Sequence, residues 1–400
     1  MITKIYSILL TGLLFLSFEA SAKRFKSGPW LFELHTNNAT VPFIVHFRWK
    51  GKKLLGELDN GLEKIALHDI TVKDDQIIIP IQTYEITMEL SKQNDKIYSG
   101  YLIRHNKNPI VKTAVKATQG VKHRFPSNRI KPEKDYTGRY RVEILDEDGA
   151  KSQGVLVLKQ KESALTGSLL TPTGDYRYFE GFVSGNEISG VSFDGMFNYR
   201  INGTVKENVF EGSLLSNYKL KISGKLDPKA DLPDAYAQTQ LEKLDFAFPD
   251  LNGKMISLQG KQFAGRPVIV QFFGSWCPNC IDEMNYLIPW YKQNHKRGID
   301  IIALAFERSL DQELAKTQLR KIQKVKQIPY TLLIAGSTAE EKPKDRIPGI
   351  KNFISFPTTI FLNKKHEVVK VHAGFTGPGT GEFFEKWKKE FNQTVDGLLK

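Results

Sequence analysis

The chain has 400 residues, of which 40% are hydrophobic and 25% are charged, so it is long enough for two or three globular domains. Its formal net charge is +13, but the lysines are scattered and do not form the aromatic-interleaved basic array that binds nucleic acid. We therefore expect no nucleic-acid partner. We interpret the charge as a solvated basic surface, with contact to an anionic membrane as the alternative.

The first 22 residues have the three parts of a secretory signal peptide. Lys4 provides a basic start, residues 5–18 are mostly apolar, and residues 20–22 have the small-x-small form of a cleavage site. We expect cleavage after Ala22, which makes segment 1–22 the signal peptide of an exported, periplasmic protein. The alternative is an uncleaved membrane anchor, although the apolar stretch is short for a membrane span.

Residues 23 to about 226 have the sequence pattern of a β-rich region. Short runs of Val, Ile, Phe, Tyr and Thr alternate with polar residues, and clusters of Gly, Asn and Asp separate the runs. Within this region, segments about 110 residues apart resemble each other. The resembling pairs are 28–34 with 138–144, 55–58 with 166–169, and 97–100 with 209–212.

This repeat predicts two similar antiparallel units, each a barrel or a sandwich. We place the first unit at residues 23–124 and the second at residues 134–226. The proline-containing, basic segment between them is predicted to be a linker. The alternative is that any two β-meanders resemble each other at this level of detail.

The pattern changes after a second predicted linker at residues 227–240. From residue 241 to residue 400, strands alternate with helix-length segments, which predicts an α/β domain with a mixed sheet. The predicted strands are 268–273, 299–306, 330–334, 359–362 and 367–372. The first predicted helix begins at Cys277 and ends near Asn294. The second is a polar helix that Ser309 or Asp311 caps and that ends near Lys326, and the third runs from about 381 to 391.

The only two cysteines of the chain are Cys277 and Cys280, directly after the buried strand 268–273. A helix N-terminus stabilises a thiolate on the first cysteine, and the second lies close enough to form a disulfide with it. An exported chain with no cysteine left for structural bridges favours a working dithiol. We predict that Cys277 attacks a substrate disulfide and that Cys280 resolves the mixed disulfide.

Three residues near the cysteines have predicted roles. Pro278 presets the backbone of the first helical turn, and Trp276 offers an apolar contact surface for substrate, unless it is a core aromatic. Glu283 lies on the same helix face as Cys280, where a buried carboxylate would take the proton of that thiol. The alternative for Glu283 is an exposed helix glutamate. Asp282 is expected to point away from the cysteines.

Phe356, Pro357 and Thr358 form the second predicted element of the site. A proline that opens a strand cannot donate to the sheet, and a cis peptide bond would present the Phe356 backbone to an extended substrate. An ordinary loop proline is the alternative. We expect no metal and no cofactor, because a zinc site built on the two cysteines would need two more ligands that no Cys or His pair offers.

Residues from about 240 to 400 resemble the TlpA/ResA-type thioredoxin-fold proteins, which are exported thiol-disulfide oxidoreductases. The resemblance rests on segments 246–254, 265–267, 276–283 and 356–359, and on Gly374 after the last strand. It implies that Pro357 is cis and packs against the disulfide. It also implies a helical insertion at residues 310–327 and a proton-relay role for Glu283.

The chain differs from cytoplasmic thioredoxins at one position and departs from the TlpA/ResA family at another, and both positions affect those expectations. Cytoplasmic thioredoxins have a buried aspartate where this chain has Gln271, so proton transfer would depend more on Glu283. The family commonly has a proline two residues after the glutamate. This chain has Asn285 there and Pro289 further on, so the helix would bend at another point. Glu307 and the loop at 374–378 would shape the rim of the site.

These observations together predict an all-β N-terminal half followed by a thioredoxin-like redox domain. We expect an exported thiol-disulfide oxidoreductase that reduces protein disulfides and receives electrons from a membrane thiol carrier; the resemblance alone implies this direction. One alternative is a peroxiredoxin-like peroxide reductase, although its Pro-x-x-x-Thr-x-x-Cys motif is absent. Another is a β-domain module that binds glycan, lipid or protein and carries an accessory redox domain.

Overall fold

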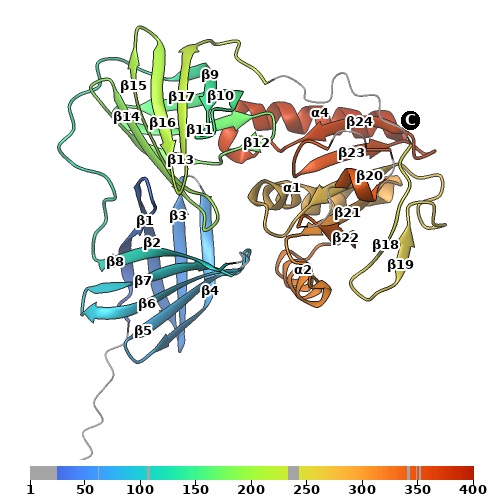
Figure 1. Ribbon diagram of the computed structural model, residues 1–400, viewed down its shortest axis with the longest axis horizontal. Coiled ribbons are helices and arrows are strands. Elements are labelled where there is room, and N and C mark those ends of the chain that lie inside the picture. The colour runs from blue at the N-terminus through green and yellow to red at the C-terminus, as the bar shows by residue number, and fades with distance from the viewer. Residues whose placement is uncertain are drawn as a thin grey trace, which may run out of the picture.

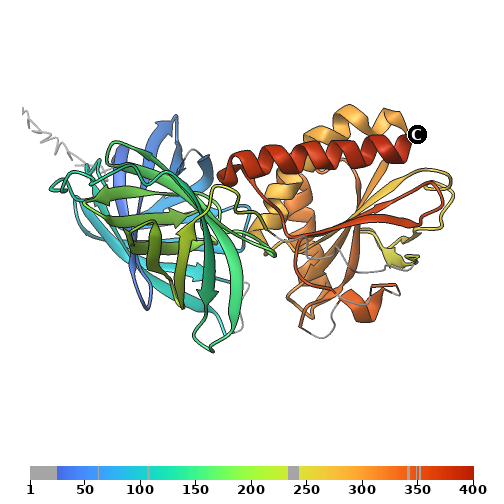
Figure 2. The same ribbon diagram turned by 90° about the horizontal axis from the view of Figure 1, so that it is seen from above.

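The computed structural model describes residues 25–61, 63–105, 109–232, 243–339, 343–347, 349–350 and 353–400. The predicted signal peptide lies outside these residues, as does most of the predicted linker at 227–240. Two β-units lie together on one side of the molecule and an α/β domain lies on the other (Figures 1 and 2). Among the described helices, none combines the length and apolar character that crossing a bilayer requires.

The first β-unit is a closed barrel of eight antiparallel strands, in which β1 pairs with β8 to complete the ring. Its strands are β1 (Gly28–His35), β2 (Thr40–Lys50), β3 (Lys53–Asn60), β4 (Glu63–Lys73), β5 (Gln76–Ile81), β6 (Ile86–Asn94), β7 (Ile97–Arg104) and β8 (Val111–Gln119). Alternate side chains point inward, so Trp30, Phe32 and Leu34 of β1 are all buried. Side chains therefore fill the barrel interior, as small barrels require.

The second β-unit is also a closed barrel, because β10 pairs with both β9 and β11. Its strands are β9 (Gly138–Leu145), β10 (Lys151–Lys161), β11 (Ala164–Thr171), β12 (Gly174–Asp175), β13 (Phe179–Ser184), β14 (Glu187–Phe193), β15 (Asn198–Lys206), β16 (Val209–Leu215) and β17 (Lys219–Leu226). The two-residue strand β12 is an addition that pairs with the end of β11. Buried Tyr140, Tyr199 and Phe210 belong to its core.

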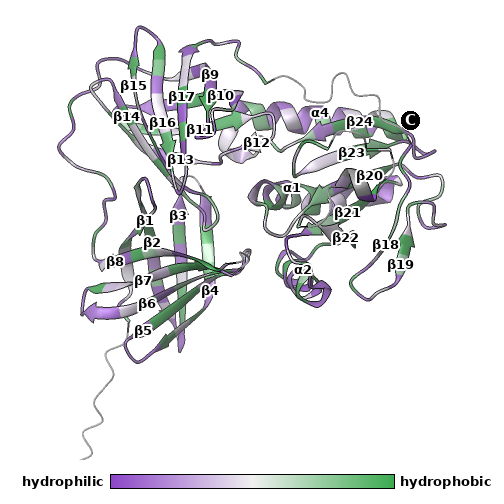
Figure 3. Ribbon diagram, viewed as in Figure 1, coloured by the Kyte–Doolittle hydropathy of each residue, from purple (hydrophilic) through white to green (hydrophobic). Residues whose placement is uncertain are grey.

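The sequence repeats fall on equivalent strands of the two barrels. The first pair of resembling segments lies on β1 and β9, the second on β3 and β11, and the third on β7 and β16. If the short β12 is set aside, these are the first, third and seventh strands of each barrel. The prediction of two similar antiparallel units is therefore confirmed, and both are barrels. The stripes of hydropathy along their strands are visible in Figure 3.

The C-terminal domain contains the predicted mixed sheet, with strand order β22-β21-β20-β23-β24. Its strands are β20 (Val268–Phe273), β21 (Asp300–Glu307), β22 (Thr331–Ser337), β23 (Thr358–Leu362) and β24 (Val368–Ala373). Strands β20, β21 and β22 are parallel, β23 runs antiparallel to β20, and β24 runs antiparallel to β23 and thus in the same direction as the first three. A further hairpin, β18 (Ala247–Pro249) with β19 (Met255–Ser257), was not predicted.

Helices and the hairpin cover different faces of this sheet. The helices are α1 (Pro278–Asn294), α2 (Gln312–Lys326), α3 (Pro343–Arg346) and α4 (Glu382–Leu399). Side chains of α1, α2 and α4 pack in one cluster with Ile269 of β20, and the hairpin packs in another cluster with Val268. Helix α4 is longer than predicted because Val395 and Leu398 continue its buried face.

The three domains meet at one buried guanidinium, that of Arg177. Its Nη2 lies 2.7 Å from Glu63 of the first barrel, and its Nη1 lies 2.5 Å from Asp194 of the second. Its Nε lies 3.0 Å from Asp282 on α1 of the C-terminal domain. The Arg177 side chain is only 6% exposed, and Asp194 and Asp282 are buried with it, so water screens these two pairs little and their carboxyl groups need the cation to offset their lost hydration.

We predict that Arg177→Met strongly destabilises the folded chain. Removing one partner of a buried ion pair leaves the other charges unpaired in a medium that solvates them poorly, at a cost of about 3–5 kcal/mol. Urea denaturation followed by tryptophan fluorescence measures the change in the free energy of unfolding.

Arg139→Met is the matched control, because Arg139 also joins the second barrel to the C-terminal domain. Its partner Glu382 is 61% exposed, and exposed pairs contribute about 0–1 kcal/mol. Equal losses in the two variants would contradict a special role for the buried cluster.

Candidate active site

The two cysteines lie where β20 leads into α1. Cys277 is the N-cap residue of α1, and its side chain accepts a hydrogen bond from the Cys280 backbone N–H, with an N–Sγ distance of 3.2 Å. The two sulfurs form a disulfide, with Cα atoms 5.3 Å apart. Cys280 is completely buried, and Cys277 keeps 4% of its surface exposed. Cys277 is therefore the more accessible member of the pair.

Glu283 is buried one helical turn beyond Cys280. One carboxylate oxygen accepts a hydrogen bond from Thr359 Oγ1 at 2.6 Å, and the other accepts one from Gln271 Nε2 at 2.7 Å. Burial raises the pKa of Glu283 to about 7, although both hydrogen bonds favour the ionised form. Glu283 is thus not an exposed helix glutamate, and it titrates near neutral pH.

Trp276 occupies the side of the site next to Phe356. Its ring lies 5.5 Å from the Phe356 ring, and its indole N–H donates to the Phe306 carbonyl at 2.9 Å. The Arg308 guanidinium lies 4.3 Å from its ring centroid, which is a cation–π geometry. Trp276 is half-buried, so one part of the ring packs against the domain and another part faces outward.

The second predicted element contains the expected cis peptide bond, between Phe356 and Pro357. Thr358, the first residue of β23, donates from its hydroxyl to the Ser355 carbonyl at 2.7 Å. The Gly374 N–H donates to the Pro357 carbonyl at 2.7 Å. This bond holds the loop after β24 against the cis proline.

Glu307 holds the segment that precedes the cysteines. Its carboxylate accepts hydrogen bonds from the Ser275 backbone N–H at 2.8 Å and from the Ser275 hydroxyl at 2.6 Å. Burial raises the pKa of Glu307 above its ordinary value. Ser275 was not predicted as a site residue, because a lone serine before the motif has no distinguishing sequence signal.

The second barrel contacts the motif directly, which the sequence analysis did not predict. Asn279, between the two cysteines, is buried and donates from Nδ2 to the Asp175 carbonyl at 3.1 Å. The Asp175 carboxylate accepts a hydrogen bond from the Gly377 N–H at 2.6 Å. Asp282 does point away from the cysteines, toward Arg177 of the same barrel. These partners are about a hundred residues or more from the motif in sequence, so no local pattern could reveal them.

A cleft of about 710 Å³ lies on the Trp276 side of the site. Its walls come from the first barrel and from the C-terminal domain, and the lining includes Thr83, Glu85, His105, Ser275, Trp276 and Arg308. Thr83 and Glu85 belong to the turn between β5 and β6, and His105 follows β7. Gln318 of α2 donates to the Glu85 carboxylate, so the two walls are joined at one edge.

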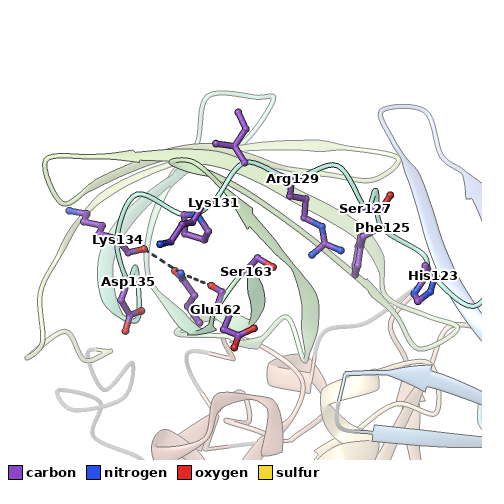
Figure 4. A pocket seen from close by; sticks show the side chains of 12 residues that line it. His123, Phe125, Ser127, Arg129, Lys131, Lys134, Asp135, Glu162 and Ser163 are labelled. Atoms are coloured by element: carbon purple, nitrogen blue, oxygen red, sulfur yellow. Dashed lines mark hydrogen bonds between the residues drawn. The ribbon is translucent and has the colours of Figure 1, made fainter.

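A second hollow, of about 840 Å³, lies away from the cysteines (Figure 4). The segment between the two barrels and the edge of the second barrel line it, and neither cysteine belongs to it. Gln160 donates to the carbonyls of Lys134 and Glu162 across it. Within the described residues, no cluster of three or more His, Cys, Asp or Glu side chains is placed to hold a metal ion.

Comparison with known proteins identifies relatives of the C-terminal part. The Redoxin family model matches residues 237–383. Thiol-disulfide oxidoreductase ResA of Halalkalibacterium halodurans is 30% identical over 152 residues, which cover 37% of this chain and 77% of that protein. ResA of Bacillus thuringiensis subsp. konkukian is 29% identical over 149 residues, or 37% of this chain and 76% of that protein. The crystal structure of a putative thiol:disulfide interchange protein DsbE from Chlorobium tepidum covers 40% of this chain and all of its own, with 18% identity and a TM-score of 0.31.

Proposed function

Because the chain belongs, through its C-terminal domain, to the ResA family of thiol-disulfide oxidoreductases, we propose that it is exported and reduces protein disulfides with Cys277 and Cys280. The observation that carries the proposal is the geometry of the pair. The two sulfurs lie within bonding distance at a helix N-terminus, and only Cys277 retains exposed surface. This arrangement suits an attacking thiol and a resolving thiol.

The proposed reaction transfers two electrons from the dithiol to the substrate disulfide. The Cys277 thiolate attacks one substrate sulfur, and the other substrate sulfur leaves as a thiolate. The Cys280 thiolate then attacks Cys277 Sγ, which releases the second substrate thiol and forms the Cys277–Cys280 disulfide. The Cys280 N–H, 3.2 Å from Cys277 Sγ, and the other free N–H groups at the start of α1 favour negative charge on Cys277.

Glu283 serves in this proposal as the proton acceptor for Cys280. The carboxyl is buried beside β20 and β23, and burial raises its pKa to about 7. A base with a pKa near the working pH transfers protons efficiently in both directions. Gln271, which replaces the buried aspartate of cytoplasmic thioredoxins, binds Glu283 instead of competing with it for the proton.

Export and electron supply complete the proposal. Segment 1–22 has the pattern of a cleavable signal peptide. An exported reductant has no access to cytoplasmic reducing systems, so it requires an electron donor that crosses the membrane, for which a membrane thiol carrier is suitable. The resemblance to the family supports the reducing direction, with protein disulfides as the substrates.

We predict that Cys277→Ala abolishes disulfide exchange, because the attacking sulfur is lost, whereas Cys280→Ala accumulates mixed disulfides through Cys277. Incubation with an oxidised protein substrate, followed by non-reducing electrophoresis and mass spectrometry, detects both results. Full turnover by the Cys277→Ala protein would disprove the proposed function.

Glu283→Gln is predicted to remove a pH dependence from the exchange rate. In the wild-type protein the resolution step speeds up as pH rises through about 7, because Glu283 must be ionised to accept the Cys280 proton. The variant lacks this rise and resolves mixed disulfides more slowly. Stopped-flow fluorescence of the reduced protein between pH 5 and pH 9 measures the profile.

Stability provides a separate readout for the same variant. The pKa of Glu283 is raised from 4.5 to about 7, so the folded chain binds more protons than the unfolded chain between these pH values. The free energy of unfolding therefore falls as pH rises from about 4.5 to about 7, by on the order of 3 kcal/mol. In the Glu283→Gln variant, this decrease in the free energy of unfolding with rising pH should be absent. If only the stability profile changed and the rate profile did not, Glu283 would have a structural role alone.

The reduction potential of the Cys277–Cys280 couple tests the direction of transfer. We expect a value near that of thioredoxin, about −270 mV, or lower. Equilibration with dithiothreitol or glutathione buffers, with Cys280→Ala as the control without a disulfide, measures it. A value near that of a strong oxidant, about −120 mV, would mean that the protein forms disulfides in its partners.

A further inference from the structure

One end of the second barrel covers part of the redox site. We call residues 171–175, which connect β11 to β12 and include β12, the covering turn. A Cβ atom on Gly174 would overlap Asn279 Nδ2, and a Cβ on Gly374 would lie 2.5 Å from the Thr173 carbonyl carbon. The backbone of the covering turn therefore lies in close contact with the motif at Asn279 and with the loop after β24 at Gly374.

The covering turn is also held firmly in place. Asp175 accepts hydrogen bonds from the Gly377 N–H and from the Arg177 N–H, each at 2.6 Å. Arg177, two residues further on, is buried among carboxylates of all three domains. Separation of the second barrel from α1 would break the ion pair between Arg177 and Asp282, and the loss of one partner of a buried ion pair is unfavourable. The covering turn is thus a fixed wall of the site and not a mobile cap.

The cleft beside Trp276 adjoins the cysteine motif, because Ser275 and Trp276, which directly precede Cys277, line it, and we take it as the approach of substrate to Cys277. Its opposite wall is the end of the first barrel, formed by Thr83, Glu85 and His105. The volume, about 710 Å³, lies within the range of about 300–1,000 Å³ that is typical of small-ligand sites. By contrast, a folded domain of about 100 residues has a radius of gyration near 13 Å, so it is much larger than a cleft of this volume.

We propose that the two barrels form part of the active site and restrict its substrates to disulfides in flexible, extended polypeptide segments. This inference rests on the proposed reductase function and adds its substrate class. A polypeptide segment fits the lining because Leu310 and Leu314 belong to the cleft and expose 55% and 46% of their surfaces. Together with Trp276 they offer apolar contacts to the side chains that flank a substrate cysteine.

The reaction in this cleft follows the proposed exchange. Cys277 attacks the sulfur of the polypeptide cysteine, the other half of the substrate disulfide leaves as a thiolate, and Cys280 releases the polypeptide thiol. The dithiol is oxidised to the Cys277–Cys280 disulfide as the substrate disulfide is reduced. No other reactant is needed for a single turnover.

Three mixed disulfides with thionitrobenzoate test the inference, because each releases a coloured thiolate. The first is made with cysteine, the second with a flexible ten-residue peptide, and the third with one surface cysteine of a folded protein. The rate of each with the reduced full-length protein is divided by its rate with dithiothreitol. We expect the normalised rate of the peptide to exceed that of the folded protein by about tenfold or more, because small misplacements of reacting atoms are costly. Equal normalised rates would overturn the inference.

Thr83→Trp tests the wall that the first barrel provides. The larger side chain narrows the cleft, so the peptide probe should slow several-fold and the cysteine probe should change little. Gln93→Trp is the matched control, because Gln93 is exposed near the opposite end of β6. An unchanged peptide rate in folded Thr83→Trp protein would contradict this approach path.

Gly174→Ala tests the covering turn. Its Cβ would overlap Asn279 Nδ2 and push the covering turn away from the motif, so the folded-protein probe should gain rate relative to the peptide. Gly149→Ala is the matched control, since Gly149 also has a positive φ, of 85°, but has open space at its Cβ. A similar gain for all three probes would show instead that the covering turn is a cap that inhibits the enzyme, and would overturn the proposal of a fixed wall.

The cysteine probe separates the two levels of the proposal. If wild-type protein fails to react even with this small disulfide, the reductase function itself is wrong. If it reacts with the cysteine probe and does not distinguish the peptide from the folded protein, the exchange chemistry stands and only the substrate restriction fails.

Discussion

The buried guanidinium of Arg177 is the contact on which the arrangement of the three domains depends. One guanidinium pairs with carboxyl groups from the first barrel, the second barrel and helix α1. Such a cluster depends on its shared cation, because the buried carboxylates would otherwise lose their hydration without compensation. The barrels are therefore held against the redox helix by this contact and are not attached to it through the connecting chain alone. The cluster ends on Asp282, two residues after Cys280, so the same contact places the barrels at the site.

Burial also determines the chemistry of the C-terminal domain. Glu283 lies in the apolar layer between α1 and the sheet, and this environment, more than its hydrogen bonds, moves its pKa toward neutrality. Glu307 is desolvated in the same way and holds Ser275 in front of the cysteines. The disulfide thus lies between two buried carboxyls with different tasks. One is the proton acceptor for Cys280 in the proposed mechanism, and the other binds the backbone that leads to Cys277.

Much of the fold follows from local sequence patterns. Strand β20, with six consecutive buried residues, was predictable because a fully buried strand must be apolar throughout. The two barrels were predictable as β-units because inward and outward residues alternate, and the repeats match equivalent strands. The closure of the barrels was not predictable, because no local pattern specifies the registers in which β1 pairs with β8 and β10 pairs with β11. The hairpin β18–β19 was also missed, because strands of three residues are too short to show alternation.

The sequence alone determined the redox pair, its position at a helix N-terminus, and its neighbours Trp276 and Glu283. These depend on short spacings within a helix or a turn, where the covalent chain fixes which residues are neighbours, whereas the cis form of Pro357 followed only from the family resemblance. The tertiary structure alone decided which surfaces surround the pair. Asn279 with Asp175, Asp282 with Arg177, and the cleft between Trp276 and Glu85 each join residues about a hundred or more positions apart. Such contacts arise from the packing of whole domains, in which the total burial of charge and apolar surface selects the arrangement, so the motif by itself does not reveal them.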